Sequence, residues 1–179
     1  MRKVATQMTP LYRKWIMASR LCMLSTVGPD GTDGSPRGDD GSMVKELDEY
    51  TLAMPDWRGN NRLDSLRNIV VDGRVSLMFV IPGPNNVVRV NGIARLTDDV
   101  ELQARFERNN ILLATIIVIK IVEIYSQCAS AFMRTGTWSR DDARGLPTVG
   151  EILAEMTDGE VGGLTYDAER GGRAAKTMW

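Results

Sequence analysis

The sequence predicts a mainly β fold, a small barrel of about six short and mostly antiparallel strands with helices at its rim. Short runs rich in β-branched and aromatic residues recur along the chain, and Gly, Pro, Asn and Asp turn signals separate them. The early runs are joined by segments short enough for hairpins. The sequence lacks regular strand–helix alternation with a Gly-rich first turn, and it lacks a P-loop, so a doubly wound fold is disfavoured.

The six strands are expected at 21–27, 32–37, 47–54, 75–81, 87–96 and 116–125. The first two form a hairpin around the turn at 28–31. Pro36 and the glycines near it interrupt the second strand, because proline cannot donate to a strand ladder. The third strand is expected to bend at Asp48. Strict alternation in the fifth strand places Arg89 and Asn91 on the same face.

Helices are expected where a polar capping residue precedes apolar residues at helical spacing. The predicted N-caps are Thr9, Asn61, Asp98 and Thr148. A further short helix is expected at 127–134. From residue 157 the chain is Gly-rich and polar, so we expect it to be disordered or ordered only against a partner subunit. The predicted organisation is therefore one domain over 1–156 and a polar tail over 157–179.

The composition removes several classes of function. The chain has 179 residues, of which 43% are hydrophobic, so it can bury one sizeable core. Its 22 basic and 23 acidic residues nearly balance, so the composition lacks the excess of positive charge that is typical of proteins that bind nucleic acid or an anionic membrane. Histidine is absent, so histidine-dependent nucleophiles and imidazole metal sites are excluded, and no metal site is expected.

The two cysteines, Cys22 and Cys128, are far apart and have no ligand spacing, so we expect neither zinc nor a disulfide and predict that both are buried. The N-terminus has no apolar segment followed by a cleavage site, which favours a cytoplasmic protein. The longest apolar run, 111–119, is too short to span a bilayer and is interpreted as a buried strand.

A candidate anion site lies before the helix expected to begin near Asn61. A helix start carries unpaired N–H groups and partial positive charge, and Arg58 and Arg62 stand beside a Gly/Asn turn there. The segment therefore suits a phosphate group. The alternative is a capped surface helix whose arginines are solvated, and this stretch alone leaves both interpretations open.

Several segments in the right order resemble the pyridoxamine 5′-phosphate oxidase-like FMN-binding split-barrel family, closest to its branch of FMN-dependent flavoproteins of unassigned substrate. The matching segments are 24–31, 34–39, 55–66, 89–92, 122–134, Trp138 and 146–151. The resemblance implies a six-stranded antiparallel split barrel. It also implies a homodimer that binds FMN in two equivalent clefts between its subunits.

The resemblance assigns cofactor-binding roles to particular residues. They are Ser35, Pro36, Arg37, Gly38, Asn60, Asn61, Arg62, Arg89, Asn91, Arg134 and Trp138. The segment 35–38 would line the flavin ring and ribityl chain, with Arg37 near the phosphate. Segment 60–62 would hold the phosphate, and Trp138 with Arg134 would reach FMN from the other protomer. The alternatives to these cofactor-binding roles are a solvated Arg37, a bulge at Asn91 and a structural role for Trp138.

The function that the resemblance implies is an FMN-dependent oxidoreductase acting on an unidentified small molecule. Oxidation of pyridoxamine phosphate is disfavoured, since the family's true oxidases use a histidine that this chain lacks. No residue is typical of a general acid or base, so no catalytic residue is assigned. A non-catalytic protein that binds or stores FMN, deazaflavin or haem therefore remains the alternative.

Overall fold

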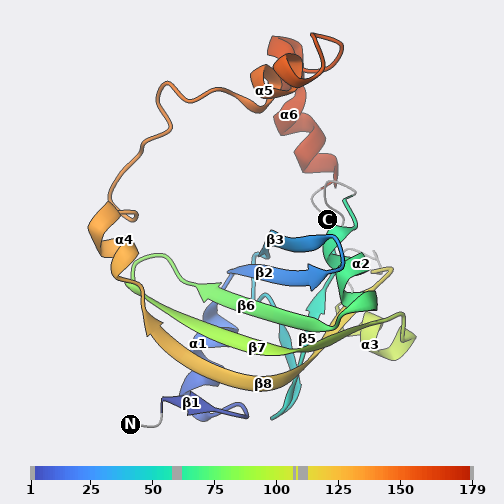
Figure 1. Cartoon of the computed structure of the whole chain (residues 1–179), viewed down its shortest axis with the longest axis vertical. Coiled ribbons are helices and arrows are strands. Elements are labelled where there is room, and N and C mark those ends of the chain that lie inside the picture. Colours follow the sequence, from blue (N-terminus) through green and yellow to red (C-terminus); the bar gives the residue numbers. More distant parts are fainter. Residues whose placement is uncertain (1–2, 58–61, 107, 109–112, 178–179) are drawn as a thin grey trace. The chain divides into compact units, whose positions relative to one another are not determined.

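The computed structural model describes residues 3–57, 62–106, 108 and 113–177. The chain divides into two compact units, and the larger one comprises Met1–Asp56 and Asn61–Trp138. The smaller unit comprises Trp57–Asn60 and Ser139–Trp179. Figure 1 gives the element labels used below.

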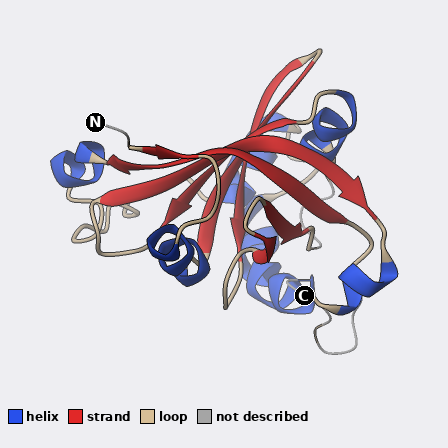
Figure 2. Ribbon diagram, turned by 90° about the horizontal axis from the view of Figure 1, so that it is seen from below, coloured by secondary structure: helices blue, strands red, loops and turns tan. Residues whose placement is uncertain are grey.

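The larger unit is built on one antiparallel sheet. Its strands are β1 (Val4–Ala5), β2 (Leu21–Gly28), β3 (Gly31–Gly38), β4 (Lys45–Asp48), β5 (Thr51–Pro55), β6 (Arg74–Val80), β7 (Asn86–Thr97) and β8 (Ile116–Cys128). They are ordered β3-β2-β6-β7-β8-β5-β4, and β1 pairs with β8. The long strands β7 and β8 curve side by side (Figure 1), and helices lie around the strands (Figure 2). The predicted mainly β class is confirmed, with eight described strands in place of six.

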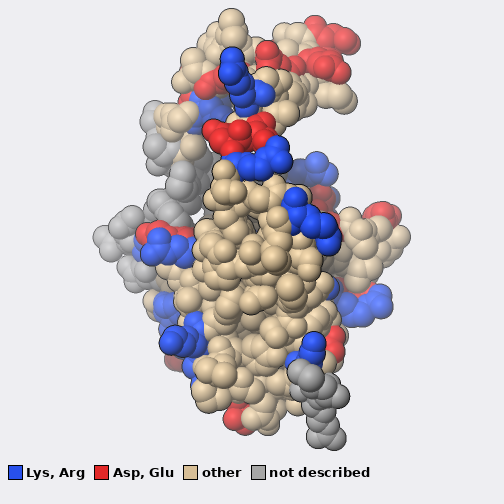
Figure 3. Space-filling view, turned by 90° about the vertical axis from the view of Figure 1, so that its left-hand side faces the viewer, with Lys and Arg blue, Asp and Glu red and all other residues tan. Residues whose placement is uncertain are grey.

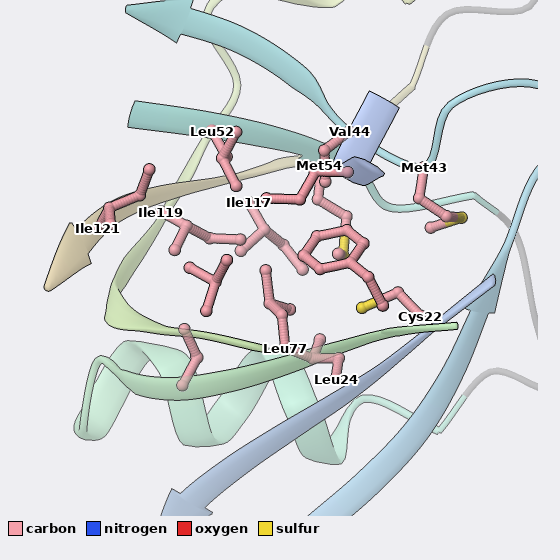
Figure 4. Packing of buried hydrophobic residues seen from close by; sticks show 14 of the residues in the cluster. Cys22, Leu24, Met43, Val44, Leu52, Met54, Leu77, Ile117, Ile119 and Ile121 are labelled. Atoms are coloured by element: carbon pink, nitrogen blue, oxygen red, sulfur yellow. The ribbon is translucent and has the colours of Figure 1, made fainter. Parts of the chain in front are cut away.

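Four helices flank the sheet, namely α1 (Pro10–Ala18), α2 (Asp64–Val71), α3 (Val100–Ala104) and α4 (Ser130–Thr135). The core lies on the concave side of the sheet. Leu24 and Leu77 point across it toward Met54 and Ile117 (Figure 4), and all four are fully buried. Alternate residues of each strand supply this core, as period-2 patterning requires.

Most of the expected strands are confirmed, with two differences in detail. The interruption predicted near Pro36 is absent, because Pro36 pairs with Met23 within β3. The strand lies at the edge of the sheet, where a missing N–H costs no ladder bond. The strand expected at 47–54 is instead the hairpin β4–β5, which turns between Asp48 and Thr51.

The predicted helix caps are partly correct. Thr9 caps α1, and its side chain accepts from the Tyr12 N–H. The N-cap of α2 is Leu63, without a side-chain bond, and Asn61 lies outside the described residues. Asp99 caps α3, one residue later than expected. Several neighbouring polar residues can each serve as the N-cap, so the sequence predicts the start of a helix only to within one or two residues.

The smaller unit contains two helices, α5 (Val149–Met156) and α6 (Gly163–Thr177). Thr148 and Glu151 form the expected capping box at the start of α5. The Asp167 carboxylate on α6 accepts from the Gly150 N–H at 2.8 Å and from the Thr148 hydroxyl at 2.5 Å. A residue with a Cβ at position 150 would meet Asp167, so the glycine permits this close approach. Residues 163–177 form a helix, whereas the composition predicted a tail that is disordered or ordered only against a partner subunit.

The two cysteines differ in environment. Cys22 lies in the core of the larger unit, as predicted, whereas Cys128 is exposed at the end of β8, which contradicts the prediction for that residue. The last residues of β8 extend beyond the core that its earlier residues pack against, so the side chain of Cys128 is exposed. Within the described ranges, every helix is too short or too polar to cross a membrane.

Candidate functional site

Arg37 projects from the edge strand β3 on the side of the sheet that faces the core. It pairs directly with Cys22 on β2, so the two side chains share a face. The guanidinium Nη1 donates to Oδ1 of Asp56 at 2.6 Å, and only 17% of the Arg37 side chain is exposed. Its Nε is buried and has no hydrogen-bond partner among the described residues. Arg37 thus pairs with one carboxylate, and its Nε–H group can still donate a hydrogen bond.

Burial sets the chemistry of the neighbouring thiol. Removal from water raises the pKa of Cys22 to about 12, and the charge of nearby Arg37 lowers it only in part. Cys22 therefore stays protonated at neutral pH and acts as a small core residue.

The four predicted site residues of β3 divide between the two faces. Ser35 pairs with buried Leu24 and lies on the same side as Arg37. Pro36 and Gly38 alternate with them and lie on the opposite, exposed side. Only Ser35 and Arg37 can therefore contact one group on the core-facing side.

Arg89 and Asn91 share the opposite face of the sheet, on β7. Arg89 donates to the Ser76 hydroxyl at 3.1 Å, and its guanidinium lies 5.6 Å from the centre of the Tyr125 ring. Asn91 donates to Oε1 of Glu123 at 2.6 Å. The Nε of Arg89 and the Oδ1 of Asn91 are buried without partners in the described part of the chain. This face therefore carries a polar cluster with unused hydrogen-bonding groups.

The register separates Arg37 from Arg89. Pairing runs from Arg37 through Cys22 and Phe79 to Val88, the neighbour of Arg89 on β7. Adjacent residues of a strand point to opposite faces, so Arg89 lies on the other side of the sheet. Three strand spacings also place β3 and β7 about 14 Å apart. Within one chain, the predicted arginines do not converge.

The bulge that was the alternative to a cofactor role for Asn91 is present. The register of β7 against β8 shifts between Asn91 and Gly92. A Cβ at Gly92 would lie 2.5 Å from the Lys120 carbonyl oxygen, so this position requires glycine.

The start of α2 faces carboxylates of the same chain. Arg62 is 75% exposed and pairs with Asp64 at 3.0 Å. Ser65, which is buried, donates to the Asp33 carboxylate of β3 at 2.5 Å. These two carboxylates already lie close to the positive end of the helix. Asn60 and Asn61 lie outside the described residues.

Trp138 and Arg134 belong to the α4 region. The Trp138 ring packs edge-to-face on Phe132 with centroids 5.1 Å apart, and its Nε1 donates to the Pro84 carbonyl at 3.3 Å. Trp138 is 37% exposed, so part of its ring remains available to a second molecule. Arg134 is exposed in the last turn of α4, where a cation favours the helix dipole.

Charges also pair at the end of β3. Arg108 donates to Asp39 at 2.8 Å and to Asp40 at 2.5 Å. The hydrogen bond from Arg108 is the main reason why the pKa of Asp40 is lowered. Basic and acidic side chains are likewise interspersed over a mostly uncharged surface in Figure 3.

Sequence reasoning missed the partners of the predicted site residues. They are Asp56, Ser76, Glu123 and Tyr125. The alternation of β8 puts Glu123 and Tyr125 on one face, so pairing this strand with β7 would have found them. No local signal joins Asp56 to Arg37, since their contact arises only through the fold.

The donor set suits an oxyanion. A guanidinium presents a planar fork of N–H groups that matches phosphate, and both Arg37 and Arg89 keep a buried Nε that has no partner within the described part of the chain. Among the described residues there is no cluster of three or more acidic or cysteine side chains that could hold a metal ion. Each of these two guanidinium groups therefore has the chemistry to bind a phosphate group.

The comparisons with known proteins agree with the fold. HupZ of Group A Streptococcus matches with a TM-score of 0.56 and 16% identity, over 68% of this chain and 95% of HupZ. A candidate pyridoxamine 5′-phosphate oxidase of Lactobacillus delbrueckii matches with a TM-score of 0.54 and 20% identity, over 68% of this chain and 95% of that one. At these identities the likeness shows a common fold.

No curated protein matches the chain significantly. The family model for pyridoxamine 5′-phosphate oxidase, however, matches residues 8–128, which is more than half of the chain. This match confirms the resemblance found in the sequence. The chain therefore belongs to the pyridoxamine 5′-phosphate oxidase family.

Proposed function

We propose that this protein binds FMN and acts as an FMN-dependent oxidoreductase on a small molecule. The observation that carries the proposal is Arg37, a largely buried guanidinium whose Nε has no partner among the described residues. A buried N–H without an acceptor costs free energy, and a phosphate bearing nearly two negative charges is a strong acceptor. Membership of the family supports FMN as the molecule that carries this phosphate.

FMN would supply the hydride or electron transfer, and the chain would bind and orient it. Arg37 is proposed to hold the phosphate, with Asp56 fixing the direction of the guanidinium. Ser35 lies on the same face and would contact the adjoining part of the cofactor. Arg62 is proposed to contact the phosphate as well, as are Asn60 and Asn61, which lie outside the described residues.

We also propose a homodimer with FMN between the subunits. Arg37 and Arg89 lie on opposite faces of one sheet, so a ligand that contacts both would need Arg89 from a second copy. The buried groups of Arg89 and Asn91 that lack partners favour a covering molecule on that face. Trp138 and Arg134 of the second copy are proposed to reach the same cofactor. Because both cysteines are free, we place the protein in the reducing cytoplasm.

Non-catalytic binding or storage of a cofactor is the second candidate. Its support is that the carboxylates in contact with Arg37 and Asn91 are engaged by these donors, Asp56 by Arg37 and Glu123 by Asn91. Neither one is positioned as a free general base. Oxidation of pyridoxamine phosphate is not proposed, because the chain has no histidine.

The test is a titration of the cofactor-free protein with FMN and with riboflavin, which lacks the phosphate. Arg37→Met should weaken FMN binding by roughly 10- to 100-fold, the value of one charge-assisted hydrogen bond, and should leave riboflavin binding unchanged. The matched control is Arg74→Met, which removes an exposed arginine that also pairs with an aspartate. Equal FMN affinity in the wild type and in Arg37→Met would contradict the phosphate site.

Catalysis and assembly need separate measurements. Turnover of a reduced nicotinamide or another donor that disappears when FMN is removed supports the oxidoreductase. Bound FMN that no donor reduces favours storage instead. Analytical ultracentrifugation should give a dimer, and a monomer that still binds FMN tightly would contradict the shared site.

A further inference from the structure

A cavity of about 500 Å³ lies at one end of the sheet of the larger unit, between β1, α1 and the paired ends of β7 and β8. This volume is within the range of small-molecule sites, and the mouth of a barrel is a common place for one. None of its lining residues is among those expected to hold the flavin.

The cavity exists because β1 is short. This strand pairs with β8 only at Val4 and Ala5, opposite Tyr125 and Ile124. The next N–H of β8, that of Ser126, is instead donated to the Tyr12 hydroxyl of α1 at 3.2 Å. Tyr12 in turn donates to the Lys3 carbonyl at 3.1 Å, so it fixes β1, α1 and β8 around the opening.

The lining is polar and carries one kind of charge. Lys3 is the only charged residue among the described residues that line the cavity. Asn86 and Gln127 also line it, and the register puts the Asn86 side chain on the same face of the sheet as Cys128 and that of Gln127 on the other face. Cys128, an exposed free thiol, completes the wall beside Asn86, with which it pairs across the strands. One ammonium, one amide and a thiol, without a carboxylate, suit a small anion.

We propose that this cavity is a second ligand site, which binds a small molecule bearing a carboxylate or phosphate group. Lys3 would pair with the anionic group, and the Asn86 amide would donate a hydrogen bond to the rest of the ligand. Tyr12 positions the wall, since both of its hydrogen bonds are made within the chain. Cys128 lies where a bound ligand would shield it, so its reactivity reports occupancy.

The test compares alkylation of Cys128 by iodoacetate and by iodoacetamide, which have the same reactive carbon but differ in charge. In both reactions the thiolate forms a C–S bond, iodide leaves, and the thiol proton passes to solvent. The other thiol, Cys22, is in the core and does not compete. Cys128→Ser provides the blank. The rate is followed by mass spectrometry of the purified full-length protein at several reagent concentrations.

The iodoacetate rate should saturate with concentration and fall when inorganic phosphate is added, whereas the iodoacetamide rate should rise linearly. Lys3→Gln should abolish saturation and lower the iodoacetate rate by about fivefold, a typical size for a partly exposed ion pair. It should leave the iodoacetamide rate unchanged. The matched control, Lys14→Gln, removes an exposed α1 lysine outside the cavity and should behave as wild type.

A linear iodoacetate rate in the wild type, or a rate that phosphate does not change, would overturn the proposal. Equal effects of Lys3→Gln and Lys14→Gln would also overturn it, because they would reflect the charge of the whole surface.

Discussion

Replacing Asp56 with Asn removes the carboxylate that neutralises Arg37 in the larger unit. The Arg37 and Asp56 side chains are 17% and 20% exposed, and their closest N and O atoms are 2.6 Å apart. Breaking a buried pair costs about 3–5 kcal/mol, and an exposed pair contributes about 0.2–1 kcal/mol. At this intermediate burial, and with Asn keeping an acceptor oxygen, we expect the free energy of unfolding to fall by about 2 kcal/mol.

The assay is urea unfolding of the cofactor-free protein at pH 7, followed by tryptophan fluorescence. With a slope of about 2 kcal/mol per molar urea, the midpoint of Asp56→Asn should fall by about 1 M. The matched control is Asp72→Asn, whose partner Arg74 is 69% exposed, and its midpoint should fall by much less. If Asp56→Asn unfolds at the wild-type midpoint, the ion pair does not hold Arg37 and the argument for its orientation is wrong.

Two further predictions concern packing and pH. Gly28→Ala adds a Cβ that would overlap the side chain of Asn68, which donates to Thr26 at 3.1 Å, so it should cost about 1–3 kcal/mol in the wild type. It should cost little in an Asn68→Ala background, and additive costs in a urea double-mutant cycle would contradict the overlap. The hydrogen bond from Arg74 lowers the pKa of Asp72 from 3.8 to about 2. Because the folded-state pKa is the lower one, this stabilisation is present above about pH 4 and is lost toward pH 2, so acid-unfolding curves of the wild type and Asp72→Asn should converge near pH 2. A constant separation of the two curves at every pH would refute this assignment.

Local signals in the sequence predicted a large part of the fold. The hairpin of β2 and β3 follows from a tight turn whose Gly31 adopts a φ of 129°. The capping box at Thr148 follows from residue types three positions apart. The shared face of Arg89 and Asn91 follows from the period of a strand. Each of these features depends on residues that are close together in the chain, so its determinants can be read without the tertiary structure.

The sequence by itself thus determined the β class, the family and most strands, and it predicted the residues of the candidate site. Only the tertiary structure decided that Arg37 and Arg89 lie on opposite faces, because facing depends on the register between strands that are distant in sequence. It also brought Asp56 to Arg37 and left Cys128 beside a cavity. Such contacts join residues far apart in the chain, and no local pattern encodes which side chains will meet once the sheet has formed.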